Sequence, residues 1–223
     1  DIAADSELSE QSVLRTVGVA SRAIIQFNDE SELRIDGNTE VELTTITDKR
    51  IVIRQVTGYT FNRVSSESDR KYTVESTNAR YESEGTAFKV ITSGDEQAAE
   101  VYYDTIVETN TNKKPKQGEK LTVLSNNRPS ESNTISKLDI ELVKQDPFIQ
   151  WNRAIEQASD KFKAVLGFLT DFDAPDITIS SPTDNEVILL EPGAEAGSVQ
   201  ITGKTERRAR LTVQSKSQSG SSP

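Results

Sequence analysis

The sequence predicts an all-β protein that carries one long amphipathic helix. Apolar and polar residues alternate over most of residues 13–124, and turn-forming residues interrupt this alternation roughly every ten residues. One later stretch instead repeats its apolar residues at the three- and four-residue steps of a helix. Only 34% of the residues are hydrophobic, which favours thin layers of strands with polar surfaces over a thick α/β core.

Residues 13–124 are predicted to form one β domain of short strands. The run at 51–56, Ile-Val-Ile-Arg-Gln-Val, is typical of a strand, and the Thr-Gly pair at 57–58 ends it. The spacing of the strands fits a β-sandwich, a barrel or a β-solenoid, and periodicity alone does not choose among them. The predicted strands cover residues 23–27, 32–35, 41–44, 51–56, 72–77, 87–91, 101–103, 106–108 and 120–124.

Residues 125–145 are predicted to be a polar connector, followed by an amphipathic helix over residues 146–170 that packs on the β domain. Asp146 can cap this helix, and Pro147 suits the first helical position because its missing N–H has no partner there in any case. The apolar residues recur at helical spacing and form a stripe about six turns long. The residues expected to define the packing face are Trp151, Ile155, Phe162 and Leu169.

The chain beyond the helix is predicted to return to β structure. Strands are expected at 177–182, 199–205 and 209–213, within a segment that spans residues 176–214. Residues 215–223 are rich in Ser and Gly and hold no residue that could form a core, so this tail is predicted to be disordered.

The composition excludes several kinds of chemistry. The chain has no His and no Cys, so it has no imidazole base, no thiolate nucleophile and no His/Cys zinc cluster. Lys–Ser and paired-carboxylate schemes stay open on composition alone, but solvated strand faces explain pairs such as Glu82 and Glu84 better. We therefore expect no enzyme, no catalytic residues and no metal ligands. Calcium is a minor alternative, because several aspartates gather near the predicted linker: Asp171, Asp173, Asp176 and Asp184.

The net charge of −10 disfavours nucleic acid as a partner, because an acidic chain repels phosphate groups. Two short basic clusters are the exceptions, and neither is interleaved with aromatic residues that could stack on bases. Solvated loops explain them better than nucleic-acid contacts. They consist of Lys113, Lys114, Lys116, Arg207, Arg208 and Arg210.

The stretch at residues 72–90 carries a resemblance to a known family. It reads as a strand, then Thr77-Asn78-Ala79, then Gly-Thr-Ala-Phe-Lys-Val at 85–90, and it resembles the FecR domain family of bacterial envelope proteins. Three residues depart from the family pattern: Glu30 and Asp104 stand where glycine is usual, and Asn78 stands where proline is usual. The residues assigned to the structural motif are Gly58, Thr77, Gly85, Thr86, Phe88 and Gly118.

The segment from 177 to 213 resembles the start of a bacterial immunoglobulin-like module. The similar features are Ser-Pro-Thr-Asp-Asn at 181–185, the strand and Gly-Lys-Thr at 199–205, and Leu-Thr-Val at 211–213. About three strands are predicted in this segment, whereas such a sandwich needs roughly seven. The resemblance therefore implies a truncated immunoglobulin-like module.

The FecR resemblance implies a non-enzymatic domain outside the cytoplasmic membrane, in the periplasm or at the cell surface. The chain starts at Asp1 and contains no Met, so we expect the full-length protein to be anchored in the membrane by a segment upstream of it. The preferred interpretation is a binding or scaffold domain that contacts an envelope protein or a surface polysaccharide. The alternatives are a periplasmic signal-relay domain that regulates a sigma factor and a carbohydrate-binding accessory domain. No ligand-binding residue can be assigned.

Overall fold

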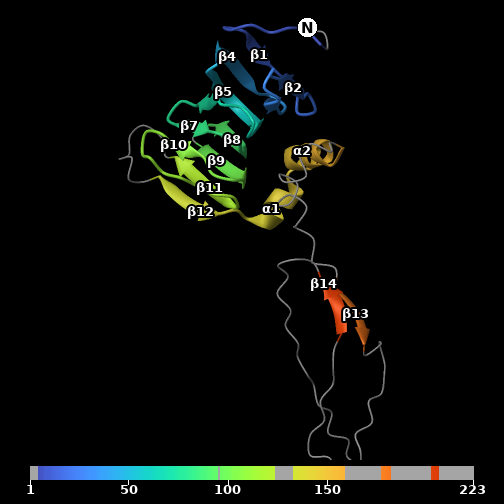
Figure 1. Cartoon of the computed structure of the whole chain (residues 1–223). Helices are drawn as coiled ribbons and strands as arrows, with labels where there is room; N and C mark the ends of the chain where they lie inside the picture. The colour runs from blue at the N-terminus through green and yellow to red at the C-terminus, as the bar shows by residue number, and fades with distance from the viewer. Residues whose placement is uncertain (1–4, 95, 124–132, 159–176, 182–201, 206–223) are drawn as a thin grey trace, which may run out of the picture. The chain divides into compact units, whose positions relative to one another are not determined.

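The computed structural model describes residues 5–94, 96–123, 133–158, 177–181 and 202–205. The chain divides into two units, Asp1–Phe172 and Asp173–Pro223. The first unit contains a β domain and two helices, α1 (Ile140–Gln145) and α2 (Pro147–Ala158) (Figure 1). Its strands are β1 (Val13–Arg15), β2 (Ala23–Gln26), β3 (Glu32–Ile35), β4 (Glu40–Ile46), β5 (Arg50–Arg63), β6 (Lys71–Glu75), β7 (Arg80–Ser83), β8 (Ala87–Ser93), β9 (Glu96–Tyr103), β10 (Val107–Glu108), β11 (Glu119–Val123) and β12 (Thr134–Lys137).

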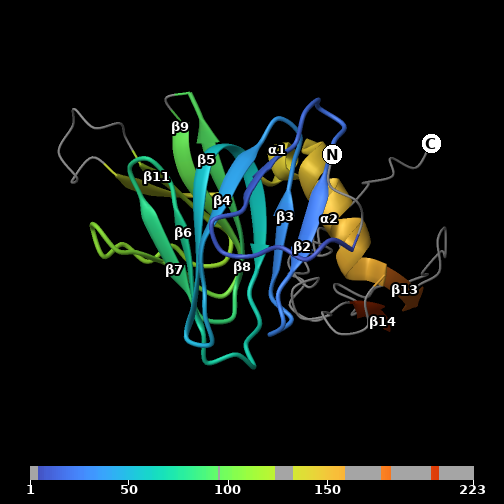
Figure 2. The same ribbon diagram turned by 90° about the horizontal axis from the view of Figure 1, so that it is seen from above.

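The long strand β5 joins the two halves of one continuous sheet. Its first part pairs with β4 and β6, in the order β1-β4-β5-β6-β7-β10. Its second part pairs with β3 and β8, in the order β2-β3-β5-β8-β9-β11-β12. The change of partners occurs near Gly58, which has φ +93° and opposes Thr92 of β8. A strand that passes from one half to the other lets the sheet curl over on itself (Figure 2).

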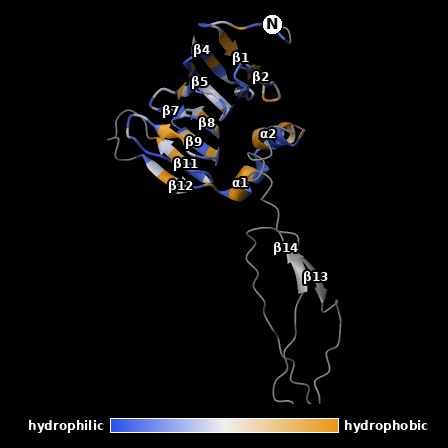
Figure 3. Cartoon of the chain, in the orientation of Figure 1, coloured by the Kyte–Doolittle hydropathy of each residue, from blue (hydrophilic) through white to orange (hydrophobic). Residues whose placement is uncertain are grey.

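The main core lies between the two halves of the curled sheet. Leu43 and Ile53 come from the first half, and Leu33, Val90 and Val101 from the second, all with no exposed surface. Apolar and polar residues alternate along the strands as this arrangement requires (Figure 3). Every described pairing in this unit is antiparallel except β5 with β6, so the fold is a curled, sandwich-like sheet. The β-solenoid alternative is wrong, because its rungs would pair in parallel.

A second core covers the outer face of the half that contains β3, β5, β8 and β9. It combines Phe61 and Tyr102 from the sheet with Val143 of α1 and Phe148 and Ile149 of α2. The first six residues of β8 are buried, and so are six of the eight residues of β9, because these strands have the main core on one face and the helices on the other. The helices therefore complete this layer of the domain.

The prediction that residues 125–145 are a polar connector is wrong for the part that the structure describes. Residues 134–137 form β12, which pairs with β11, and residues 140–145 form α1. All four side chains of β12 are exposed, so this strand has no alternating apolar face by which a sequence pattern could reveal it. Helix α1 is only six residues long, and Asp139 caps it by accepting hydrogen bonds from the backbone N–H groups of Glu141 and Leu142.

The predicted helix over residues 146–170 corresponds in its first part to α2. Asp146 accepts hydrogen bonds from the backbone N–H groups of Phe148 (2.8 Å) and Ile149 (3.4 Å), and Pro147 occupies the first helical position. The remaining predicted helical residues, 159–170, lie outside the described part of the chain.

The second unit is described for two antiparallel strands, β13 (Ile177–Ser181) and β14 (Thr202–Thr205). Both lie within strands that the sequence predicts. The predicted strand at 209–213 and the tail at 215–223 are outside the described residues. The truncated immunoglobulin-like module therefore stays a prediction.

Two departures from the family pattern coincide with strained backbone. Glu30 (φ +67°) and Asp104 (φ +57°) both adopt the left-handed conformation, in which glycine has no steric penalty. The glycines that the FecR pattern carries at these two places would fit this backbone. The chain keeps both turns with less suitable residues.

We expect Asp104→Gly to raise the free energy of unfolding by up to about 1 kcal/mol, because it removes the left-handed penalty at an exposed position. Urea unfolding followed by circular dichroism measures the change. The control is Asp48→Gly, at an exposed position where φ is not positive, which should lower stability. A lower stability for Asp104→Gly would contradict the prediction.

Candidate functional site

The candidate site is the surface of the β domain that α2 covers, which we call the docking face. Alternation along the strands places Glu32 and Arg34 of β3, Arg63 of β5 and Lys89 of β8 on the face opposite the main core. These charged side chains lie among the aromatic residues of the second core. The docking face is thus a mixed surface, apolar in part and strongly charged in part.

The deepest contact on the docking face is an ion pair between Arg34 and Glu156 of α2. The two side chains have no exposed surface, and Arg34 Nη2 lies 2.5 Å from Glu156 Oε1. Arg34 also pairs with Glu32 (2.6 Å) and donates a hydrogen bond to Asn152 Oδ1 (3.2 Å). Arg63 Nε lies 3.9 Å from the other carboxylate oxygen of Glu156. Helix α2 is therefore held in its last turn by buried charges. We call the cluster of Glu32, Arg34, Arg63 and Glu156 the ionic clasp.

Burial dominates the electrostatics of the ionic clasp. It raises the pKa of Glu156 above its ordinary value, and the attraction of Arg34 and Arg63 only partly offsets this effect. Burial also lowers the pKa of Arg63, against the opposing effect of Glu156. A carboxyl whose pKa is raised by folding contributes stability below its unfolded pKa, and this contribution is lost as the pH rises through its folded pKa.

We therefore expect the wild-type chain to gain stability relative to Glu156→Gln as the pH falls from neutral toward 4.5, the ordinary value for this carboxyl. Urea unfolding at about pH 7 and about pH 5 measures the difference between the two proteins. Glu141→Gln is the control, because the Glu141 side chain on α1 is 75% exposed and its variant should follow the wild type. An unchanged difference between wild type and Glu156→Gln would contradict the prediction.

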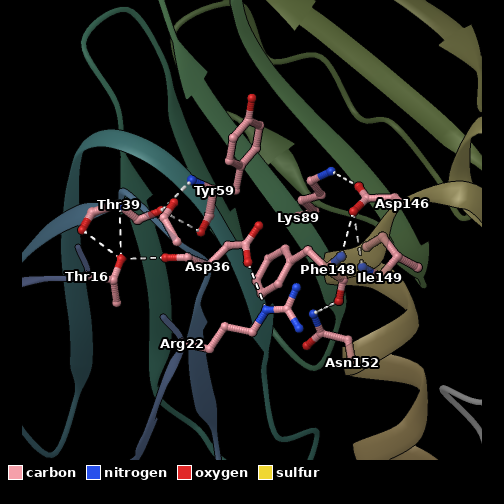
Figure 4. A network of polar contacts seen from close by, with 11 residues as sticks. Thr16, Arg22, Asp36, Thr39, Tyr59, Lys89, Asp146, Phe148, Ile149 and Asn152 are labelled. Atoms are coloured by element: carbon pink, nitrogen blue, oxygen red, sulfur yellow. Dashed lines mark hydrogen bonds and ion pairs between the residues drawn. The ribbon is translucent and has the colours of Figure 1, made fainter. Parts of the chain in front are cut away.

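A second charged contact holds the start of α2 (Figure 4). Lys89 Nζ lies 2.5 Å from Asp146 Oδ2 and 3.8 Å from Glu100, and its side chain is 7% exposed. Tyr102 donates a hydrogen bond to Glu100 (2.8 Å), and burial followed by the charge of Glu100 raises the pKa of this phenol. Asp146 thus binds the sheet with one oxygen and caps α2 with the other.

A third contact combines charge with aromatic surface. Arg22 donates a hydrogen bond to Asp36 (2.9 Å), and its guanidinium lies 5.9 Å from the ring centre of Phe148 and 5.2 Å from that of Trp151. The two rings stack at 5.9 Å. Figure 4 shows the Arg22 guanidinium beside both the Asp36 carboxylate and the Phe148 ring. This cation–π contact therefore holds the half-buried Trp151 as well as the buried Phe148 of α2.

The predicted packing face of the helix is rotated with respect to the observed one. Trp151 and Ile155 are half-buried, whereas Asn152 and Glu156, which a hydrophobic pattern does not select, are fully buried. Phe162 and Leu169 lie outside the described residues. The sequence interpretation missed Asn152 and Glu156 because their partners on the sheet are distant in the chain. The signal that could have found them is the four-residue spacing of Phe148, Asn152 and Glu156 on one face of the helix.

The residues assigned to the structural motif lie in turns, inside β5 and in the main core rather than on the docking face. Gly58 lies within β5, so the predicted end of that strand at 57–58 is wrong. Gly58, Gly85 and Gly118 have positive φ, and a Cβ on Gly85 would lie 2.9 Å from the Cα of Ser66. The hydroxyl groups of Thr86 and Ser83 are hydrogen bonded, and Phe88 is buried in the main core. Thr77 is exposed in a bend between β6 and β7.

The described contacts of the docking face hold a helix against the sheet. In residues 5–94, 96–123 and 133–158, no group of three or more Asp or Glu side chains is placed to hold a metal ion. The four aspartates considered for calcium all lie outside the described residues. The carbohydrate-binding alternative would use aromatic side chains that stack on a sugar. Most of the aromatic residues considered for this role are buried: Phe61, Tyr72, Tyr81 and Tyr102. None of the described helices is long and apolar enough to cross a membrane.

Comparison with known proteins gives one family and one recurring fold. Residues 13–106 match the model of the family described as FecR protein. No curated protein matches the chain. Two solved structures of a candidate anti-sigma factor from Parabacteroides distasonis ATCC 8503 are similar to it, with TM-scores of 0.51 and 0.50 and 14% sequence identity.

The similarity to these two structures covers 60% of this chain and 62% and 63% of theirs. It therefore spans less than two thirds of the length of those chains. At this level of identity the comparison shows a shared fold, and it assigns no activity or partner to this chain.

Proposed function

Because residues 13–106 of this chain belong to the FecR protein family, we propose that the protein is the extracytoplasmic part of a regulator that relays a signal to a sigma factor. The family match is the observation that carries the proposal. The similar fold of a candidate anti-sigma factor supports it. In this proposal the protein is non-enzymatic and acts by binding other proteins.

The comparisons favour the relay over the scaffold that the sequence interpretation preferred. A scaffold was inferred mainly from the immunoglobulin-like segment, and the similarity to known proteins lies instead in the β domain. The buried aromatic residues also give no support to a carbohydrate-binding domain. A relay is the remaining interpretation that both the family and the fold support.

The ionic clasp gives the proposed relay a physical basis. Buried ion pairs contribute little net stability compared with apolar packing, but breaking one of them leaves a buried charge that strongly favours another arrangement. Helix α2 follows the β domain in the chain and is held by Arg34, Arg63 and Lys89. A partner that binds the β domain could thus change how firmly α2 is held against it.

The proposal is tested in the source organism with an in-frame chromosomal deletion of residues 13–158. We expect transcription of a defined set of genes to change, measured by RNA sequencing with and without the deletion. Arg34→Met, which breaks the ionic clasp, should alter the same genes, whereas Arg54→Met, at a solvent-exposed ion pair with Glu42, should not. Unchanged transcription in the deletion strain would refute the relay and return the scaffold to first place.

A further inference from the structure

Strand β2 lies at an edge of the sheet and has unpaired backbone groups. Among the described strands it pairs only with β3. In the hairpin that joins them, the Phe27 N–H donates to the Ser31 carbonyl. Hydrogen-bonded and non-bonded positions alternate along an antiparallel strand, so Ile25 and Ala23 are the next residues of β2 that bond to β3. The N–H and C=O groups of Ile24 and Gln26 therefore point away from β3. Such an edge is a template on which another extended chain can pair.

A groove of about 900 Å³ runs beside this edge. Ile25, Phe27 and Leu43 form part of its apolar lining, and Ile24 is 48% exposed. Three carboxylates also line it, those of Asp5, Glu7 and Glu30, and its lining contains no Lys or Arg. The groove thus combines unpaired backbone groups of β2, apolar surface and an acidic lining.

We propose that this groove binds an extended basic segment of a partner protein, which adds a strand to β2. Backbone hydrogen bonds to Ile24 and Gln26 would supply affinity, and alternating apolar and basic side chains would match the apolar and acidic parts of the lining. A second copy of this chain is a poor occupant, because it would bring like charges together in a protein of net charge −10. The inference rests on the proposed function in one respect: the partner is taken to be a protein that delivers the signal.

The test uses the full chain and a short fluorescein-labelled peptide in which lysine and valine alternate. Fluorescence anisotropy should show binding that weakens as the salt concentration rises. Ile24→Pro should weaken it at least about tenfold, because proline removes an outward N–H and is tolerated on an edge strand. The matched control is Ile135→Pro on β12.

Ile135 is a close match for Ile24. It is 40% exposed, it lies on the opposite edge of the same half of the sheet, and it pairs with Leu121 of β11. The Leu138 N–H donates to the Gly118 carbonyl, so by the same alternation the N–H of Ile135 points outward. Ile135→Pro should bind the peptide like the wild type. Circular dichroism checks that both variants remain folded.

A second measurement does not depend on any variant of the protein. A peptide that is N-methylated on the backbone of one edge, or one with glutamate in place of lysine, should lose binding to the wild-type chain. The proposal is overturned if the lysine–valine peptide does not bind, if it binds Ile24→Pro as tightly as wild type, or if sedimentation shows a dimer that Ile24→Pro abolishes.

The result of the peptide-binding experiment can be distinguished from that of the deletion experiment that tests the proposed function. If the deletion strain changes transcription but the peptide does not bind, the relay stands and the groove is not its partner site. If the peptide binds but transcription is unchanged, the groove is a protein-binding site without the relay. If both hold, a chromosomal Ile24→Pro variant should alter the same genes as the deletion, and Ile135→Pro should not.

Discussion

Replacing Arg34 with methionine is expected to lower the free energy of unfolding by about 3–5 kcal/mol, because it leaves a buried carboxylate without its main partner. Glu156 has no exposed surface, and its other described ion pair, with Arg63, has the longer separation of 3.9 Å. Glu32 loses its partner as well. We expect the loss to appear first as release of α2 from the docking face.

Trp151 reports this release directly, because it is the single tryptophan of the chain and lies on α2. Urea unfolding followed by tryptophan fluorescence and by circular dichroism should give two different midpoints for Arg34→Met. Coincident transitions with the stability of the wild type would show that the ionic clasp does not hold the helix.

Two variants control for the loss of an arginine as such. Arg54→Met removes an exposed guanidinium that pairs with Glu42 at 3.1 Å, and it should cost no more than about 1 kcal/mol. The double variant Arg34→Met with Glu156→Leu removes both charges of the pair, and it should recover much of the stability because apolar packing replaces a buried ion pair at little cost.

Gly58→Ala is expected to lower the free energy of unfolding by about 3 kcal/mol or more. Gly58 has φ +93°, a conformation that costs a residue with a side chain about 1–2 kcal/mol. An added Cβ would also lie 2.6 Å from the Cα of Thr39, so backbone on a neighbouring turn would have to move, which adds about 1–3 kcal/mol. Gly58 lies where β5 changes partners, and the variant should therefore destabilise the whole β domain.

Gly94→Ala is the matched control, because Gly94 also has positive φ (+54°) but a Cβ there would meet no atom within 4 Å. It should cost only the conformational penalty, about 1 kcal/mol. Thermal or urea unfolding followed by circular dichroism compares the two variants. Equal losses for Gly58→Ala and Gly94→Ala would show that the close approach of Thr39 is unimportant.

Local signals in the sequence account for most of the strands and for the start of the helix. Alternation is a property of neighbouring residues, so β4 and the first part of β5 could be read from 41–44 and 51–56. The capping role of Asp146 also depends only on the residues that follow it, and the structure shows those hydrogen bonds. The FecR motif at 85–90 depends on the same kind of local order and is matched by the family.

The ionic clasp could not be predicted in this way, because its members come from distant parts of the chain. Arg34 and Asn152 are 118 positions apart, and nothing near either residue indicates that they meet. Hydrophobic periodicity selected Trp151 and Ile155 for the packing face. The helix instead buries Asn152 and Glu156, because both contact the buried Arg34 of the sheet. The strand β12 was missed for a related reason, since it is defined by pairing with β11 and not by its own exposed side chains.

The sequence alone thus determined the β class, most strands and the FecR match, because each of these depends on the preferences of a few consecutive residues. Only the tertiary structure decided that the sheet curls at β5, that charges hold α2 and that β2 pairs with β3 alone among the described strands. These features depend on which strands and side chains meet across long separations in the chain. Which strands pair and which side chains meet is set by the packing free energy of the whole domain.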